Sequence, residues 1–328
     1  MRVIAGDVGG TKTLLALCEV SDAGVRSLDQ RRYESQGYAR VEDMLRAFAA
    51  EVDLRGATGA CLGVAGPVED GVCRATNLPW TLDELGVGEA MGVQGARLVN
   101  DFYAAASGVA TLSPADLVTV QAGAPRLDAP RVVIGAGTGL GEALLVPVDG
   151  RWVCVPGEGG HADFAARSAR EDLLVAALRA RHGRVSWERV VSGVGLAEVY
   201  RHLASTTPGR ESPQVARELA QGDPGAVIGA HALAGDDPLC AEAVDLFLEA
   251  YGAEAGNAAL RVLARGGLYL AGGIAAKLLP LLAGGSFLRG FHDKGRMRGI
   301  AESVPVHVVT DESLGLKGAA AIAAGRAR

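Results

Sequence analysis

A strand, a glycine-rich turn and a second strand occur twice in this chain, and this repeated unit is its strongest constraint on the fold. Residues 2–8 alternate as a strand does, Gly9-Gly10 follows, and residues 11–20 predict the strand that completes a hairpin. Residues 131–148 have the same plan around the run Gly135-Ala-Gly-Thr-Gly-Leu-Gly141. The repetition suggests an ancient duplication, in which each half of the chain opens with the same unit.

Helix-like and strand-like segments alternate after these units. Residues 41–52 and 102–109 carry apolar side chains at helical spacing, whereas residues 57–65 and 97–99 are strand-like. At roughly 150 residues per domain, a chain of 328 residues predicts about two domains. The alternation therefore indicates an α/β fold in two parts. Further helices are predicted over residues 190–203, 213–220, 238–263 and 316–324.

The charge balance argues against a polyanionic partner. The chain has 32 Lys and Arg residues against 38 Asp and Glu residues, a net charge of −6. Phosphate backbones are held by clustered basic side chains, so nucleic acid is not expected as a partner. A small anion is still compatible with this charge if backbone N–H groups bind it. Glycine provides such accessible backbone, because 46 glycines in 328 residues are about twice the usual share.

Cysteine usage and hydropathy predict the compartment. The five cysteines are scattered, with no C-x-x-C pair, so we expect reduced thiols in a cytoplasmic protein. The chain reaches an acid at Asp7 before an apolar signal region forms, and Lys277 and Glu142 interrupt the longest apolar stretches elsewhere. We therefore expect neither secretion nor a membrane span.

The first glycine loop, Gly6-Asp-Val-Gly-Gly-Thr11, combines an acid at a strand end with two consecutive glycines and a hydroxyl. Consecutive glycines can turn backbone N–H groups toward one point and so bind an anion without a basic side chain. The acid fits beside phosphates if Mg²⁺ lies between them, held through water by Asp7. The alternative is a plain hairpin turn, because Asp and Gly are common turn residues.

The second loop does not have the spacing of a dinucleotide-binding motif. G-x-G-x-x-G from Gly135 or Gly137 requires glycine at Leu140 or Glu142, and no GK[ST] tripeptide occurs in the sequence. What is left is a turn between strands with Thr138 at its tip, suited to a phosphate. A third small-residue turn, Ala271-Gly-Gly-Ile274, follows a predicted strand and could receive a flat group against bare backbone.

Asp101 is the candidate acid–base residue of the sequence. Asn100-Asp101 lies between a strand end and a helix start, where the positive end of the helix stabilises a carboxylate. An ionised carboxylate there could orient a substrate hydroxyl and receive its proton during phosphoryl transfer. The alternative is that Asn100 or Asp101 only caps the following helix.

Glu158 and His161 lie in the glycine-rich run Pro156-Gly-Glu-Gly-Gly-His161. A carboxylate and an imidazole offer acceptors and a donor that match adjacent sugar hydroxyls. Metal binding is the rival role, disfavoured because no Cys or His accompanies them at zinc-ligand spacing. Glu188 stands at a predicted helix start, where interaction with the helix dipole is the alternative to ligand binding.

The three glycine loops, in this order, resemble the first phosphate, second phosphate and adenosine motifs of the hexokinase, actin and Hsp70 superfamily of ATPase folds. The likeness runs from near Val3 to near Ala324. Five further segments resemble the bacterial ATP-dependent glucokinase family: Asn77-Leu-Pro-Trp80, Asn100-Asp-Phe102, Pro156-Gly-Glu-Gly-Gly-His161, Glu188-Arg-Val-Val-Ser-Gly193 and Asp293-Lys-Gly-Arg296.

The resemblance implies a two-domain actin-like ATPase (ribonuclease H-like) fold of the α/β class, with a cleft between the domains. We expect a small domain of residues 1–110 plus about 311–328, and a large domain of residues 111–310. The family also suggests a homodimer in the cytoplasm.

The same resemblance implies ATP as co-substrate and Mg²⁺ on Asp7, bound through water. Lys12 either lies beside the phosphates or points to solvent. ROK relatives carry a cysteine-rich zinc motif after an equivalent histidine, but Ala162-Asp-Phe-Ala-Ala166 has no cysteine, so zinc is not expected. The residues implied in ATP binding are Gly6, Asp7, Val8, Gly9, Gly10, Thr11, Gly137, Thr138, Gly139, Gly272 and Gly273.

The implied activity is phosphorylation of the 6-hydroxyl of D-glucose to glucose 6-phosphate in glycolysis, with Asp101 as general base. The alternatives are a kinase for another hexose and a sugar-sensing regulator without catalysis. The residues implied in sugar binding are Asn100, Asp101, Glu158, His161 and Glu188, with Asn77 as a further candidate.

Overall fold

The computed structural model describes residues 1–75, 78–207 and 209–326. The chain divides into two compact units. Compared with the domain bounds expected from the sequence, the first unit also takes in residues 111–117 and 143–156. The first unit comprises Met1–Leu117, Ala143–Pro156 and Asp311–Arg328, and the second unit comprises Val118–Glu142 and Gly157–Thr310.

The first unit is built on a five-stranded sheet of order β3-β2-β1-β4-β8. The opening hairpin predicted from the glycine turn is present as the antiparallel pair β1 and β2, and β4 and β8 continue the sheet in parallel. Its strands are β1 (Arg2–Val8), β2 (Lys12–Ser21), β3 (Gly24–Glu34), β4 (Ala57–Val64) and β8 (Ala96–Asn100).

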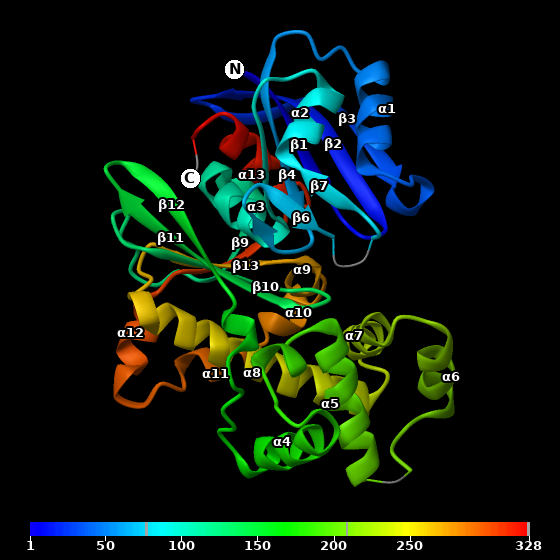
Figure 1. Cartoon of the computed structure of the whole chain (residues 1–328). Helices are drawn as coiled ribbons and strands as arrows, with labels where there is room; N and C mark the ends of the chain where they lie inside the picture. The colour runs from blue at the N-terminus through cyan, green and yellow to red at the C-terminus, as the bar shows by residue number, and fades with distance from the viewer. Residues whose placement is uncertain (76–77, 208, 327–328) are drawn as a thin grey trace. The chain divides into compact units, whose positions relative to one another are not determined.

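Helices cover both faces of this sheet (Figure 1). Successive side chains of β1 point to opposite faces, as in any strand. Ile4 packs in one apolar cluster with Phe48 of α1, and Ala5 packs in the other with Ala320 of α13. The close approach of α13 to α3 needs glycine, because a Cβ at Gly318 would overlap the carbonyl oxygen of Ala104. The helices are α1 (Val41–Glu51), α2 (Glu84–Met91), α3 (Asp101–Gly108) and α13 (Leu314–Ala323), and a small separate sheet contains β5 (Val68–Glu69), β6 (Val72–Arg74) and β7 (Thr81–Asp83).

A six-stranded sheet has the order β12-β11-β10-β13-β14-β9. Its first five strands, β12-β11-β10-β13-β14, have the same order as β3-β2-β1-β4-β8 of the other sheet. In both sheets the hairpin that contains the glycine loop is followed by two further strands on the side of its first strand. This shared order is what the predicted duplication requires. Its strands are β9 (Leu117–Gln121), β10 (Arg131–Ala136), β11 (Leu140–Val148), β12 (Arg151–Gly157), β13 (Gly267–Ala271) and β14 (Val306–Val309).

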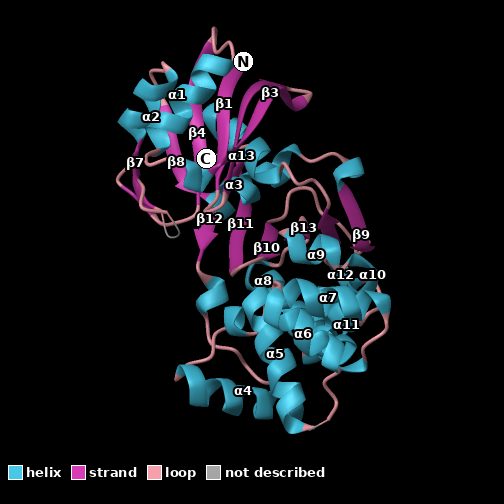
Figure 2. Cartoon of the chain, turned by 90° about the vertical axis from the view of Figure 1, so that its right-hand side faces the viewer, coloured by secondary structure: helices cyan, strands magenta, loops and turns pink. Residues whose placement is uncertain are grey.

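The helices of the second unit gather around α8, which is buried along most of its 25 residues (Figure 2). The helix predicted over residues 190–203 begins instead at Gly193, because the Ser192 side chain accepts a hydrogen bond from the Gly195 backbone and caps it. The helices are α4 (Ala169–His182), α5 (Gly193–Thr206), α6 (Pro213–Gln221), α7 (Pro224–Ala234), α8 (Pro238–Val262), α9 (Gly273–Lys277), α10 (Leu279–Leu282), α11 (Ser286–His292) and α12 (Arg298–Ser303).

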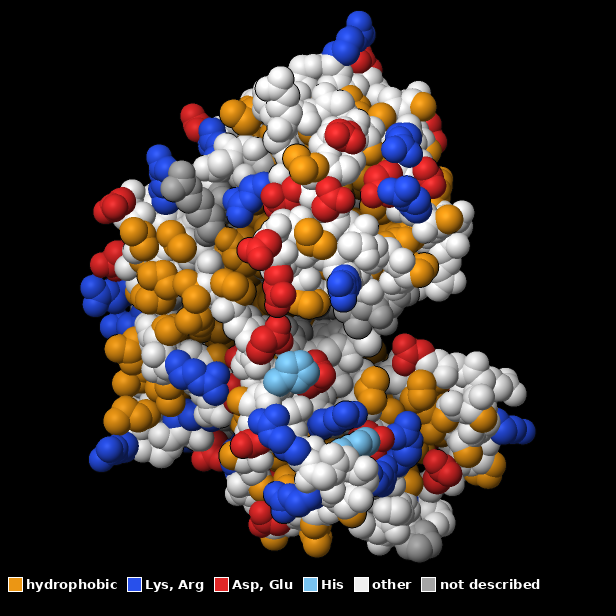
Figure 3. Space-filling view, viewed as in Figure 1, with side chains coloured by type: hydrophobic (Ala, Val, Ile, Leu, Met, Phe, Trp, Pro, Cys, Tyr) orange, Lys and Arg blue, Asp and Glu red, His pale blue; other side chains and the backbone are white. Residues whose placement is uncertain are grey.

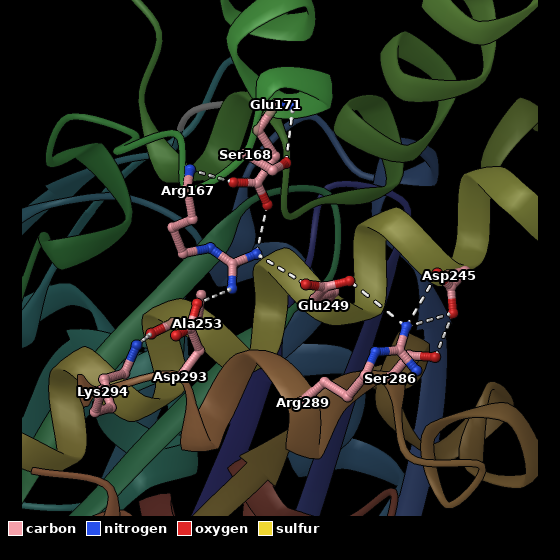
Figure 4. A network of polar contacts seen from close by, with 10 residues as sticks. All are labelled: Arg167, Ser168, Glu171, Asp245, Glu249, Ala253, Ser286, Arg289, Asp293 and Lys294. Atoms are coloured by element: carbon pink, nitrogen blue, oxygen red, sulfur yellow. Dashed lines mark hydrogen bonds and ion pairs between the residues drawn. The ribbon is translucent and has the colours of Figure 1, made fainter. Parts of the chain in front are cut away.

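The segment Asp293-Lys-Gly-Arg296 belongs to a polar network that fastens the end of α11 (Figure 4). The Arg167 guanidinium bonds to the buried carboxylate of Glu171 and lies 3.7 Å from the Asp293 carboxylate. The Lys294 ammonium donates to the carbonyl of Ala253 in α8 at 2.9 Å, and burial lowers the pKa of Lys294 to about 8. This motif therefore joins α11 to α8 and to the start of α4.

Candidate active site

The first glycine loop follows β1 and is hydrogen-bonded to Ser35. The Gly9 N–H donates to the Lys12 carbonyl at 3.0 Å, which closes the turn. The buried Ser35 hydroxyl donates to the Gly9 carbonyl at 2.8 Å, and the Ser35 N–H donates to the Thr11 carbonyl at 2.8 Å. Sequence reasoning did not identify Ser35, since nothing in its local pattern indicates this contact.

Asp7 and Asn100-Asp101 lie at the same edge of the sheet. Parallel pairing aligns Val8 with Val64 and Val64 with Asn100, so the carboxyl ends of β1, β4 and β8 meet there. Burial and, to a smaller extent, the negative charge of Asp101 together raise the pKa of Asp7 to about 6. Two oxygen donors whose charges repel each other suit a hard divalent cation, so these residues fit Mg²⁺.

Asn100, rather than Asp101, is the N-cap of α3. Its side-chain oxygen accepts from the N–H groups of Phe102 and Tyr103 at 2.9 and 3.2 Å, and its amide donates to the Gly66 carbonyl at 3.3 Å. Asp101 is the first residue inside the helix, where its carboxylate accepts from the Phe102 N–H at 2.8 Å. The capping role left open by the sequence therefore falls on Asn100.

The second glycine loop joins β10 to β11 in the second unit. The Gly137 N–H donates to the Gly139 carbonyl, and the Gly193 N–H donates to the Gly137 carbonyl, both at 2.8 Å. Glu188 lies against this loop, because its Oε2 atom accepts from the Leu140 N–H at 3.0 Å and a Cβ at Gly139 would overlap it. A residue predicted for the sugar thus contacts the second glycine loop.

The buried Tyr251 of α8 supports the same loop from below. Its hydroxyl donates to the Ile134 carbonyl at 3.2 Å and accepts from the Ala136 N–H at 3.3 Å. The third glycine turn lies beside it. Gly272 has φ +83, and a Cβ there would lie 2.7 Å from the Ala136 carbonyl oxygen, so this position requires glycine.

The structure brings three of the predicted sugar residues together. The His161 ring nitrogens lie 3.8 Å from a Glu158 carboxylate oxygen and 3.9 Å from a Glu188 oxygen. Glu158 and His161 are exposed, whereas Glu188 is half-buried. The Arg184 guanidinium donates to the His161 carbonyl at 2.9 Å and so holds the loop to the segment before Glu188. The three side chains present carboxylate acceptors and a ring nitrogen to solvent.

Some predicted residues lie elsewhere or are not described. Asn77 lies outside the described residues. Lys12 is exposed at the start of β2, and its backbone, not its ammonium, closes the first loop. Within the described ranges, no three His, Cys, Asp or Glu side chains form a group that could hold a metal ion.

Lys and Arg side chains lie among Asp and Glu side chains on the face of the molecule in Figure 3. All five cysteines are free and buried. None of the helices in the described ranges combines the length and apolar character needed to cross a bilayer.

The duplicated sheet order and the paired glycine loops define a two-domain actin-like ATPase fold of the sugar-kinase type. Solved structures share it. A glucokinase from an Antarctic psychrotroph superposes with a TM-score of 0.87 at 29% identity, covering 99% of both chains. A glucokinase from Balamuthia mandrillaris has a TM-score of 0.79 at 21% identity over 99% of this chain and 94% of its own, a likeness of fold.

Sequence comparison identifies the family within these sugar kinases. The glucokinase family model matches residues 4–326, and the chain belongs to this family. It is 41% identical to a glucokinase of Nostoc sp. over 98% of both chains. It is 40% identical to one of Synechocystis sp. over 99% of this chain and 98% of the relative.

Proposed function

We propose that this protein is an ATP-dependent glucokinase, which transfers the γ-phosphoryl group of ATP to the 6-hydroxyl of D-glucose. Glucokinases at 40–42% identity over about 98% of the chain support the proposal. The structural observation that carries it is the division of roles at α3. Asn100 caps the helix, so Asp101 is not needed as the cap and can act on a substrate.

The three glycine loops are proposed to bind ATP through backbone N–H groups. Gly6, Asp7, Val8, Gly9, Gly10 and Thr11 would form the first site, Gly137, Thr138 and Gly139 the second, and Gly272 and Gly273 the adenosine site. Asp7 would hold Mg²⁺ through water, and the bound ion would neutralise phosphate charge. A ROK glucokinase of similar fold from Streptomyces griseus was solved with glucose and AMPPNP, which supports this assignment of ligands.

Asp101 is proposed to accept the proton of the sugar 6-hydroxyl. As the bond from this oxygen to the γ-phosphorus forms, the bond from the phosphorus to the β–γ bridging oxygen breaks, and ADP leaves with that electron pair. In a loose transition state the base mainly orients the nucleophile, so a carboxylate of low basicity suffices. Glu158, His161, Glu188 and Asn100 would hold the other sugar hydroxyls, with Asn77 as a further candidate.

A coupled ADP-release assay with glucose, mannose and fructose at equal concentrations tests the proposal. The account predicts turnover with glucose above the other two sugars. Turnover favouring mannose or fructose would indicate a kinase for another hexose, and no turnover with any sugar would favour a sugar-sensing regulator.

We also propose a homodimer, which light scattering tests, and a cytoplasmic location with a role in glycolysis.

A further inference from the structure

Glu142 lies buried directly beneath the loop that carries Glu158 and His161. It is the third residue of β11, just after the second glycine loop. A Cβ at Gly159 would lie 2.6 Å from the Glu142 carboxyl carbon and would overlap one of its oxygens. The backbone of the loop therefore rests on this carboxyl group, which fixes how far the loop can approach the sheet.

A second buried carboxyl group faces Glu142 from α8. Glu254 is fully buried, and the Asn257 amide donates to its Oε2 atom at 2.9 Å. Arg261 of the same helix lies 2.9 Å from Glu254 Oε1 and 3.5 Å from Glu142 Oε2. Spacing of three and four residues along α8 places these side chains on one face of the helix.

The charges around the two carboxyl groups do not balance when both are ionised. Arg261 is half exposed, so solvent weakens its charge, and the second cation, Lys294, acts on Glu254. In the described part of the chain, Glu142 Oε1 is buried without a hydrogen-bond partner, whereas Glu254 Oε1 lies 2.9 Å from the half-exposed Arg261. A proton on one carboxyl group would remove the repulsion and supply a donor. The titratable and charged groups acting on the pair are Tyr251, Arg261 and Lys294.

The electrostatics agree with this geometry. Burial raises the pKa of Glu142 to about 7, and the neighbouring Glu254 charge contributes in the same direction. Burial also raises the pKa of Glu254. The pair thus keeps a proton below neutral pH and loses it as the pH rises through about 7.

We propose that Glu142 is a positioning residue for sugar binding, which supports Gly159 while it shares one proton with Glu254 and releases the sugar loop when that proton is lost. The predicted effect on glucose affinity rests on the proposed function. The predicted movement of the loop does not. Two ionised carboxylates repel each other, so the support under Gly159 shifts and Glu158 and His161 lose their common position. Sugar affinity then falls with rising pH, whereas nucleotide affinity does not.

The test compares the wild type with Glu142→Gln, whose amide is neutral at every pH and has nearly the same shape. Glucose binding is measured by calorimetry between pH 6 and 8.5, with AMPPNP binding measured in parallel. The wild-type Kd for glucose is expected to rise about fivefold over this range, somewhat less than the tenfold that one full pKa unit corresponds to. The Glu142→Gln variant is expected to lose most of this rise, with no change for AMPPNP.

Glu198→Gln is the matched control. Glu198 has the same exposure as Glu142, 8%, but pairs with Arg181 and Arg201 rather than with the sugar loop. It is expected to keep the wild-type pH profile. Equal pH profiles for the wild type and Glu142→Gln would overturn the inference.

Hydrogen exchange of residues 157–161 in the ligand-free protein gives a second readout that needs neither glucose nor turnover. After correction for the intrinsic rate, protection is expected to fall above pH 7 in the wild type. Unchanged protection would overturn the inference, even if Glu142→Gln does not fold. A wild type that binds no glucose while its loop loses protection would instead contradict the proposed function alone.

Discussion

Glu188 Oε2 accepts a hydrogen bond from the backbone N–H of Leu140 at 3.0 Å, while Glu188 Oε1 lies 3.9 Å from the His161 ring. One carboxylate thus lies against both the second glycine loop and His161, two parts of the proposed phosphate and sugar sites. In the proposed glucokinase, Glu188 would therefore position the phosphate-binding loop and the sugar ligands relative to each other.

Glu188→Ala is expected to raise KM for both ATP and glucose, because the Leu140 N–H and His161 both lose their neighbour. Loss of the hydrogen bond from the Leu140 N–H to this charged group costs about 1.5–3 kcal/mol, so KM for ATP should rise roughly tenfold or more. KM for glucose should rise because a proposed sugar ligand is removed. His161→Ala is the comparison, since it touches the sugar cluster only and should raise KM for glucose alone. Steady-state kinetics with each substrate varied in turn measures both KM values. A Glu188→Ala variant with only one KM changed would contradict the account.

Gly272→Ala is expected to lower the free energy of unfolding by on the order of 1–3 kcal/mol, because its φ of +83 is strained for alanine and a Cβ would press on the Ala136 carbonyl. The shift of the Ala136 backbone should also weaken ATP binding. Gly273→Ala is the matched control, since a Cβ there meets nothing within 4 Å. Urea denaturation of both variants and nucleotide titration of Gly272→Ala measure the two effects, and equal losses of stability in the two variants would speak against the assigned cause.

Asp7→Asn is expected to stabilise the metal-free protein above pH 6 while abolishing Mg²⁺-dependent turnover. The folded pKa of Asp7 is raised from 3.8 to about 6, so the unfolded chain releases this proton first and stability falls as the pH rises from about 4 through about 6. The gain in the variant at pH 7.5 is at most about 3 kcal/mol, from two pKa units. Urea denaturation at pH 5 and 7.5 checks the sign. A variant less stable than the wild type at pH 7.5 would refute the assigned cause.

The parts of the site that could be predicted from sequence are those encoded locally. Gly9-Gly10 and Gly272 follow strands directly, so the pattern of a strand and a glycine turn locates them without knowledge of the rest of the fold. The sequence indicates Asn100 as a cap candidate for the same reason. The choice between Asn100 and Asp101 needed the hydrogen bonds of the helix start.

Residues that act through distant contacts could not be predicted. Ser35 reaches the first loop from 26 positions away along the chain, and nothing around it signals that contact. The local sequence around Glu142 indicates only an acid that interrupts an apolar stretch. Its partner Glu254 lies on a helix more than a hundred residues later, so the local sequence does not indicate the pair. Contacts of this kind follow from the duplicated fold rather than from any local pattern.

The central claim is that Asp101 is the general base, and the turnover of Asp101→Asn with glucose tests it most directly. The amide keeps the shape of the side chain and can still accept from the Phe102 N–H, so α3 and its Asn100 cap should persist. The account predicts a fall in kcat of about 10²–10⁴-fold, the usual contribution of a positioned acid–base group, with glucose Kd changed no more than a few fold. A variant that phosphorylates glucose at the wild-type rate would contradict it.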